Sequence, residues 1–395
     1  MSTHHQSLGI IGSTGSLGRK VFEGAMLGRR RVLSLAGGAN VERLMVQALE
    51  CRPQVVSVSS RESAKKLEEA FEGKFPASRR PRVVWGSKGL FEVARSADDL
   101  ALTAIGLVGL EASLETLRKG GRVVVGTKEI GVVAGVCLNR MAREHGGEVL
   151  PLDSELTALL QLKRACGPQG PKKLILTASG GPLLGKKVSD LEKVSVKEVV
   201  SHPIWPMGPK VSVDSATLFN KSLEIMVASR LFSVAPEALS AVVHPQCRIH
   251  AAVETGDGAV LLQAAPTDML WAVGFALGLR REETGLCAPC VASMSELTFE
   301  EIEEGDFPAF DAGISALSEG GGGPAFLAGA DEVLVDAFLK ETIGYLDLIR
   351  GLKEALKSNC FEQVKEKNPS LVQEMIRSWD HGKGWAKDWV ESKGQ

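Results

Sequence analysis

Two acidic residues, Asp153 and Glu155, lie two positions apart in the sequence. In an extended segment this spacing points both side chains to the same face, where their oxygens suit a hard cation such as Mg²⁺ or Mn²⁺. The motif alone has a more common explanation, a helix N-terminus capped by Asp153 or Ser154. A third acid, Glu224, ends the segment that begins at Ser212, and spacing alone does not show that it meets the other two.

A glycine-rich turn follows the first apolar run of the chain. The run Leu8–Ile11 leads into the sequence GSTGSLG, whose glycines are Gly12, Gly15 and Gly18. Glycine lets the backbone turn tightly and approach a pyrophosphate, and the free N–H groups of a following helix bind phosphates. The glycines stand at positions one, four and seven rather than one, three and six, and such turns also occur without a ligand. The position after a first strand favours a dinucleotide cofactor.

The turn after the second apolar run bears on which dinucleotide binds. An NAD enzyme usually places an acid there for the ribose hydroxyls, but residues 36–40 read AGGAN. The missing acid disfavours NAD and favours NADP. Arg29, Arg30 and Arg31 precede this run, and a solvated basic turn explains them better than contact with a 2′-phosphate.

Two further loops have compositions that suit a binding site. The small residues of Ser179–Pro182 follow an apolar run, and they suit either close approach to an anion or an ordinary turn. The stretch His202–Lys210 contains three prolines, which exclude a helix or a central strand. It also carries Trp205 and Met207, so it either packs over the core or acts as a lid.

The elements that position these residues follow from the alternation of short apolar runs and amphipathic segments in the first 150 residues. Strand and helix alternating at this spacing predict parallel βαβ units and a doubly wound sheet. The predicted strands are Leu8–Ile11, Val32–Leu35, Val55–Val58, Val83–Trp85, Leu102–Ile105 and Val123–Val125, and the predicted helices include Val41–Cys51, Glu62–Phe71 and Glu111–Lys119.

The rest of the chain changes character twice. Residues 151–290 mix predicted strands with helices and proline-rich loops, which indicates an α+β domain after a first domain at 1–150. An acidic linker is predicted at 291–310, and 311–395 is helical in pattern with a glycine-rich break.

Composition excludes several classes of protein. The 395 residues include 46 Lys and Arg against 48 Asp and Glu, which argues against a dedicated nucleic-acid binder. Neither a membrane-spanning run nor a secretory signal is visible. Seven scattered cysteines predict reduced thiols in the cytoplasm, and Cys287 and Cys290 are interpreted as two structural thiols.

An ordered set of motifs resembles the 1-deoxy-D-xylulose 5-phosphate reductoisomerase family over essentially the whole chain. These motifs are GSTGSLG from Gly12, TKE from Thr127, PLDSE from Pro151, SGGP from Ser179, HPIWPMGPKVSVDSATLFNKSLE from His202 and HPQCRIH from His244. The resemblance implies a Rossmann-like N-terminal domain that binds NADPH, an α+β catalytic and dimerisation domain whose flap is residues 202–210, and a C-terminal helical domain. It also implies a homodimer that uses Mg²⁺ or Mn²⁺. The implied reaction rearranges a small phosphorylated ketose and reduces the product to 2-C-methyl-D-erythritol 4-phosphate, an isoprenoid precursor.

The resemblance also assigns roles to individual positions. It implies metal ligation by Asp153, Glu155 and Glu224, and catalytic roles for Lys128, Glu155 and His202. The implied substrate-binding residues are Ser154, Ser179, His202, Trp205, Ser215, Asn220 and Lys221. The implied cofactor-binding residues are Gly12, Ser13, Thr14, Gly15, Ser16, Leu17, Gly38, Asn40, Glu129, Met207 and Gly208. His250 matches a family histidine near the active site, with a hydrogen-bonded core histidine as the alternative.

Several positions depart from the family pattern and leave other functions open. The departures are Thr127, Leu156 and Thr157, Ala39, Val227 and the segment Ala328–Glu332. They indicate a divergent member with altered cofactor contacts or altered hydrogen bonds around the ligands. The alternatives are a paralogous NAD(P)H-dependent reductase acting on a related phosphorylated or phosphonate hydroxy-ketone, or a non-catalytic paralog.

Overall fold

A computed structural model describes residues 7–167, 170–186, 188–201, 204–205, 207–294 and 296–393. The chain folds as two units. One contains the described residues up to Ile130, with Leu138–Thr157 and Asp268–Cys287; the other contains Gly131–Cys137, Ala158–Thr267 and the described residues from Ala288 onward. The division into domains at 150, 290 and 310 stays a prediction.

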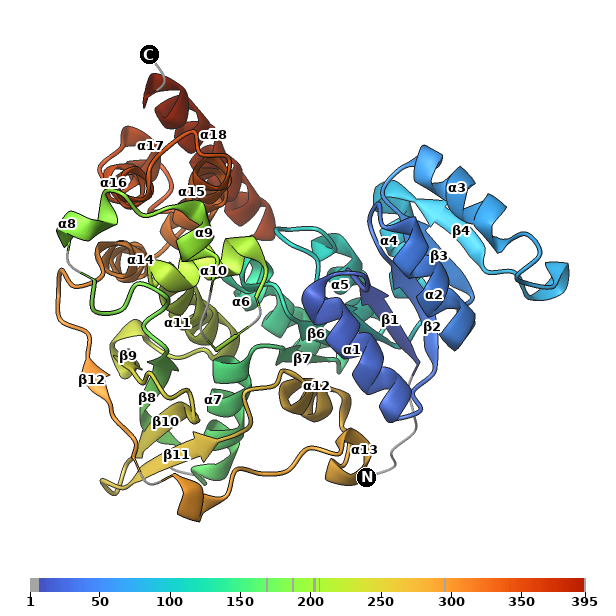
Figure 1. Ribbon diagram of the computed structural model, residues 1–395, viewed down its shortest axis with the longest axis horizontal. Helices are drawn as coiled ribbons and strands as arrows, with labels where there is room; N and C mark the ends of the chain where they lie inside the picture. Colours follow the sequence, from blue (N-terminus) through green and yellow to red (C-terminus); the bar gives the residue numbers. More distant parts are fainter. Residues whose placement is uncertain are drawn as a thin grey trace. The chain divides into compact units, whose positions relative to one another are not determined.

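The first unit is built on a seven-stranded sheet. Its strands are β1 (Leu8–Ile11), β2 (Val32–Ala36), β3 (Val55–Val58), β4 (Arg82–Trp85), β5 (Asp99–Leu102), β6 (Arg122–Val125) and β7 (Glu148–Pro151), in the order β4-β3-β2-β1-β5-β6-β7 (Figure 1). Every neighbouring pair in this sheet is parallel. The predicted doubly wound parallel sheet is confirmed.

The strand order reverses at β1, which pairs with β2 on one side and β5 on the other. In doubly wound sheets a ligand crevice forms at the carboxyl end of the strands where the order reverses. Gly12 follows β1 directly, so the glycine-rich turn lies at this switch point.

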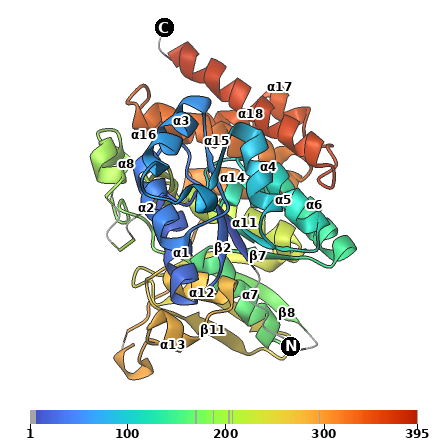
Figure 2. The ribbon, with the colours of Figure 1, turned by 90° about the vertical axis from the view of Figure 1, so that its right-hand side faces the viewer.

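Helices connect the strands of this sheet. They are α1 (Ser16–Leu27), α2 (Val41–Cys51), α3 (Arg61–Phe71), α4 (Gly86–Arg95), α5 (Leu110–Arg118) and α6 (Lys128–His145), and α7 (Ser154–Ala165) follows the last strand. Later in the chain, α12 (Leu270–Leu277) and α13 (Arg281–Thr284) return to this unit, and α12 lies beside α1 (Figures 1 and 2). The contact is close, because a Cβ at Gly24 would lie 2.5 Å from Cγ1 of Val273.

The second unit contains a mixed sheet. Its strands are β8 (Pro171–Ala178), β9 (Leu239–Val243), β10 (Ile249–Thr255), β11 (Val260–Ala264) and β12 (Glu300–Glu301), in the order β11-β10-β8-β9-β12. The β8–β9 pair is parallel and the other pairs are antiparallel. The short strand β12 lies within the range predicted as a linker.

The helices of the second unit include the C-terminal group. They are α8 (Val188–Leu191), α9 (Val196–Val199), α10 (Pro209–Ala216), α11 (Phe219–Phe232), α14 (Pro308–Glu319), α15 (Gly323–Leu339), α16 (Tyr345–Ala355), α17 (Asn359–Glu362) and α18 (Val372–Lys393). Helices α15 and α18 lie side by side (Figures 1 and 2), and a Cβ at Gly382 would meet the Phe326 carbonyl oxygen. The predicted C-terminal helical region is confirmed. Among the described residues, no helix is both long enough and apolar enough to cross a membrane.

Strand β5 lies three residues earlier than predicted. It begins at the charged residue Asp99, whereas Ile105, predicted to end the strand, is 72% exposed. Asp99 is tolerated in the core because Arg30 donates to its Oδ2 at 2.8 Å and the Arg122 backbone N–H donates to its Oδ1 at 3.1 Å. Arg30 also donates to the Leu277 carbonyl at 2.9 Å. The interpretation of Arg30 as part of a solvated basic turn was therefore wrong.

We expect Asp99→Ala to lower the free energy of unfolding by about 3–5 kcal/mol, because it leaves a buried guanidinium without its carboxylate. Urea denaturation followed by circular dichroism measures this effect. As a control, Glu92→Ala removes the partner of Arg82 in an ion pair that is more exposed than Arg30–Asp99, and it should cost about 0.5 kcal/mol or less. Equal losses in the two variants would contradict this account of β5.

Candidate active site

Asp153 caps the first turn of α7. Its Oδ1 accepts hydrogen bonds from the backbone N–H groups of Glu155 and Leu156, each at 3.1 Å. Because α7 begins at Ser154, the helix N-terminus capped by Asp153, which was the more common explanation of the motif, describes the local structure. The first helical turn still brings Glu155 close to Asp153.

Lys128 is the ionic partner of Asp153. It is the first residue of α6, and its Nζ lies 2.7 Å from Oδ2 of Asp153. The two oxygens of Asp153 therefore have separate partners, the helix N-terminus and the lysine. This ion pair places an ammonium group directly beside the acidic cluster.

Glu224 contributes a buried carboxylate from α11. Its side chain is 1% exposed, and burial of a carboxylate is costly unless it is paired. Two side chains of the preceding helical turn supply the partners, since Asn220 Nδ2 donates to Oε1 at 2.6 Å and Lys221 Nζ donates to Oε2. The i, i+3 and i, i+4 spacings on α11 thus hold this acid in place.

Arg230 fixes the later part of the same helix. Its guanidinium donates to the Val132 carbonyl at 2.6 Å and to the Gly321 carbonyl at 2.9 Å. Burial lowers the pKa of Arg230 to about 10, so it remains charged at neutral pH. These contacts tie α11 to α6 and to the turn before α15.

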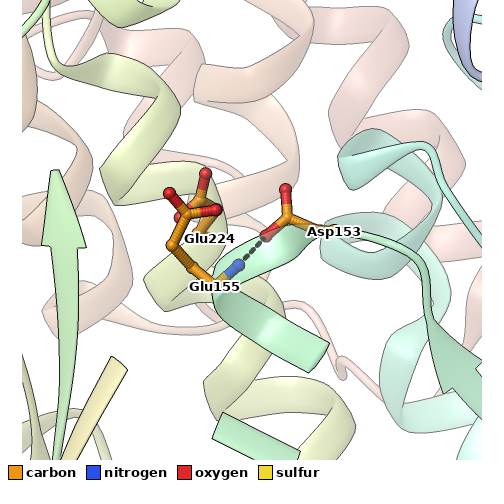
Figure 3. Close-up of side chains that lie close together, drawn as sticks. All are labelled: Asp153, Glu155 and Glu224. Atoms are coloured by element: carbon orange, nitrogen blue, oxygen red, sulfur yellow. Dashed lines mark hydrogen bonds between the residues drawn. The ribbon is translucent and has the colours of Figure 1, made fainter. Parts of the chain in front are cut away.

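The three acids singled out in the sequence meet in the structure. Figure 3 shows Asp153, Glu155 and Glu224 together, and one carboxylate oxygen from each lies within 4.8 Å of those of the others. Three convergent carboxylates suit Mg²⁺ or Mn²⁺, which take oxygen ligands. The donor set therefore fits a divalent metal centre.

The glycine-rich turn has the geometry of an anion cradle. Gly12 has φ +88°, and a Cβ there would lie 2.6 Å from the Ala104 backbone nitrogen. Helix α1 has Gly15 as its N-cap with no side-chain cap, so its first N–H groups are available to an anion. Within the described residues, the buried Ser13 hydroxyl has no hydrogen-bond partner. These features fit the pyrophosphate of a dinucleotide.

The turn after β2 lies against the glycine-rich turn. The Thr14 hydroxyl donates to the Gly37 carbonyl at 3.0 Å. Gly38 has φ +60° with open space around its Cβ position, and Asn40 caps α2 by accepting from the Arg43 backbone N–H at 3.1 Å. The local structure therefore leaves open space at Gly38, beside the turn proposed for the cofactor.

A polar contact with Thr127 orients the Glu129 side chain. The Thr127 hydroxyl donates to Oε2 of Glu129 at 2.7 Å and lies 3.2 Å from the Gly106 carbonyl oxygen. Thr127 is one of the departures from the family pattern, and its contact sets the orientation of a residue predicted to bind the cofactor. Ser154 similarly donates to Oε2 of Glu155.

Ser179 and Ser215 belong to neighbouring segments. The Gly181 N–H donates to the Ser179 hydroxyl at 3.1 Å, and a Cβ at Gly181 would lie 2.5 Å from the Ser215 carbonyl oxygen. Glycine with φ +74° is therefore needed where this loop approaches α10. The two serines predicted to bind substrate lie on segments in close contact.

Part of the predicted flap lies outside the described residues, including His202. Within the described part, the rings of Trp205 and His250 have their centroids 6.1 Å apart, and Gly208 is the N-cap of α10. His250 is buried, with Nε2 3.3 Å from the Ala265 carbonyl oxygen, as its alternative interpretation as a core histidine predicted.

One charged cluster was missed by the sequence analysis. Lys210 Nζ lies 2.6 Å from Oδ2 of Asp214 and 2.8 Å from Oδ2 of Asp331. The i, i+4 spacing of Lys210 and Asp214 could have predicted the first pair. Asp331 is 121 positions away, and no local pattern connects it to Lys210.

The fold, the glycine-rich turn and the carboxylate cluster indicate a Rossmann-type oxidoreductase with an acidic cluster that fits a divalent metal. Three family models match: 1-deoxy-D-xylulose 5-phosphate reductoisomerase over residues 8–135, its C-terminal domain model over 149–232, and a DXP reductoisomerase C-terminal domain model over 264–381. The protein with this name from Chlorobium chlorochromatii is 36% identical over 359 residues, or 90% of this chain and 93% of the relative. The one from Symbiobacterium thermophilum is 37% identical over 88% and 92%. The chain belongs to the 1-deoxy-D-xylulose 5-phosphate reductoisomerase family.

Solved structures agree with this assignment. A DOX-P reductoisomerase in complex with NADPH, fosmidomycin and magnesium matches with a TM-score of 0.91 and 30% identity, over 99% of both chains. The Zymomonas mobilis enzyme in complex with NADPH matches with a TM-score of 0.85 and 30% identity, over 98% of this chain and 99% of that one.

We expect Glu224→Gln to weaken Mn²⁺ binding by at least about tenfold, since loss of even an outer partner of a metal ligand costs about 10- to 100-fold. Isothermal titration calorimetry with Mn²⁺ measures the affinity, and circular dichroism checks the fold. Glu362→Gln, on an exposed surface pair, is the matched control. Unchanged affinity in Glu224→Gln would exclude this acid as a ligand.

Proposed function

We propose that this protein converts 1-deoxy-D-xylulose 5-phosphate to 2-C-methyl-D-erythritol 4-phosphate with NADPH and Mg²⁺ or Mn²⁺, a step in isoprenoid precursor synthesis. The observation that carries the proposal is the convergence of Asp153, Glu155 and Glu224 in a chain that belongs to this family. The metal-bound and NADPH-bound structures of similar proteins support both cofactors.

The acidic cluster would hold the metal and, with it, the reacting end of the ketose. A bound divalent cation polarises a carbonyl and stabilises charge on the substrate oxygens during the rearrangement. Lys128, held at 2.7 Å from Asp153, orients a substrate hydroxyl and stabilises developing negative charge. Ser154 keeps Glu155 oriented and binds the substrate.

The phosphate would be held by hydroxyl, amide and ammonium donors. Ser179 and Ser215 supply hydroxyls from two segments in close contact. Asn220 and Lys221 contact Glu224, but an ammonium has three donors. Lys221 can therefore bind a phosphate oxygen while it holds the metal ligand, which couples phosphate binding to the metal centre.

The glycine-rich turn would hold the cofactor through the backbone N–H groups of Thr14, Ser16 and Leu17 and through the buried Ser13 hydroxyl, with Gly12 and Gly15 shaping the turn. The N–H groups of Gly12 and Ser13 donate to the Ala36 carbonyl, and that of Gly15 to the Gly12 carbonyl. Bound NADPH supplies the hydride that reduces the rearranged aldehyde. Glu129, fixed by Thr127, is proposed to contact the cofactor together with Gly38 and Asn40. Trp205, Met207 and Gly208 are proposed to cover the substrate and the nicotinamide and to exclude water. The same role for His202 stays a prediction.

The two alternative functions gain no support. All three proposed metal ligands are present and converge, whereas a non-catalytic paralog would be free to lose them. We also retain the cytoplasm as the proposed compartment, because the chain has an odd number of cysteines at scattered spacings, seven in all.

We further propose a homodimer formed along β11. This strand is at the end of its sheet, and it exposes Val260 (58%) and Leu262 (47%). An end strand with exposed apolar side chains can pair with a second copy.

We expect the double variant Val260→Lys and Leu262→Lys to shift the protein to monomers, because it places charge on the proposed interface. Size-exclusion chromatography with light scattering measures the molecular mass. Val46→Lys, at a 63% exposed position on α2, should leave the mass unchanged. A wild-type monomer, or a double variant that stays dimeric, would contradict the interface.

We expect metal-dependent oxidation of NADPH with 1-deoxy-D-xylulose 5-phosphate, lost after EDTA treatment and restored by Mg²⁺ or Mn²⁺. Lys128→Met should lower kcat by about 10²- to 10³-fold, as for loss of other groups that stabilise developing charge. Lys66→Met, which removes an exposed ion pair, is the control. The absence of turnover by folded, metal-loaded wild type would refute the proposed function.

A further inference from the structure

A charged cluster outside the metal centre connects two helices that are distant in the sequence. Lys210 lies in the first turn of α10, and its Nζ contacts both Asp214, one turn later, and Asp331 on α15. Both carboxylates are 1% exposed, and the lysine side chain is 16% exposed. One ammonium thus joins two buried acids.

Asp331 is placed where a carboxylate is costly. It lies within α15, between buried positions such as Ala330 and Leu334. A buried charge needs a partner, yet apolar side chains at such positions often give equal or greater stability. Stability alone therefore does not explain why an acid stands at this position.

The cluster fixes one end of a helix whose other end is also fixed. Tyr345 donates from its hydroxyl to the Ala216 carbonyl at 2.9 Å, and burial raises the pKa of Tyr345, which keeps the donor protonated. Ser215 lies between Asp214 and Ala216. The helix that carries Ser215 is therefore held at both ends by contacts with C-terminal helices, at Lys210 by Asp331 and at Ala216 by Tyr345.

We propose that Lys210, Asp214 and Asp331 form a positioning triad that fixes α10, and through it Ser215, for binding of the substrate phosphate. This inference rests on the function proposed above. Asp331 touches no reacting group and acts through Lys210. Its loss should weaken phosphate binding more than it slows the chemical steps, because the proposed metal ligands lie on α7, on α11 and directly before α7.

The test compares Asp331→Ala with Glu332→Ala. Glu332 is the next residue on α15 and pairs with Lys383 on α18, so its loss perturbs the same helix without touching α10. We expect Asp331→Ala to raise the KM for 1-deoxy-D-xylulose 5-phosphate about tenfold with kcat changed less than about threefold, as for loss of a binding contact. The KM for NADPH should stay unchanged.

Asp331→Asn provides the rescue, because its amide oxygen can still accept from Lys210. We expect this variant to return the substrate KM to within about threefold of wild type. Lys210→Met removes the shared ammonium and should behave as Asp331→Ala does. If Asp331→Ala fails to fold, Lys210→Met with the Glu332→Ala control carries the same comparison.

Hydrogen–deuterium exchange tests the positioning without reference to activity. Amides of residues 210–216 should exchange about tenfold faster in Asp331→Ala, and at the wild-type rate in Glu332→Ala. Unchanged exchange in α10, or a lower melting temperature with an unchanged substrate KM, would overturn the triad. If wild type does not turn over the ketose, the proposed function fails, and exchange alone still decides whether the triad fixes α10.

Discussion

Mutual repulsion of three carboxylates is the constraint on which the rest of this structure depends. Oxygens of Asp153, Glu155 and Glu224 lie within 4.8 Å of one another, and Glu224 is almost fully buried. Like charges at this distance repel strongly where water is excluded. Lys128 and Lys221 each pair with one of the acids, which leaves one net negative charge in the cluster to attract a cation. The arrangement therefore fits the metal site proposed here.

Several helices around the cluster begin at or next to the residues that form it. Helix α7 begins directly after Asp153, and the N–H groups of its first turn donate to the Asp153 carboxylate. The same turn brings the Glu155 side chain close to Asp153. Helix α6 begins at Lys128. At the switch point of the parallel sheet, Gly12 closes the turn that leads to the uncapped start of α1. Helix starts therefore position Asp153, Glu155 and Lys128 as well as the proposed phosphate cradle.

The sequence predicted those elements of the structure that depend on residues close together in the chain. Apolar runs indicated most strands of the parallel sheet, and the motifs with the family resemblance indicated the three acids. Strand β5 was misplaced because its first residue, Asp99, is a buried charge whose ionic partner, Arg30, is distant in the sequence. Asp331 was missed for the same reason, since its partner Lys210 lies 121 positions away. Long-range charge pairs leave no periodicity in a sequence.

The most direct test of the central claim is a crystal structure grown with Mn²⁺, with anomalous data collected near the manganese absorption edge. The account predicts one strong anomalous peak bound by oxygens of Asp153, Glu155 and Glu224, at metal–oxygen distances of about 2.0–2.3 Å. It also predicts that Lys128 remains beside the cluster. A peak bound elsewhere, or the three carboxylates separated with no metal between them, would contradict it.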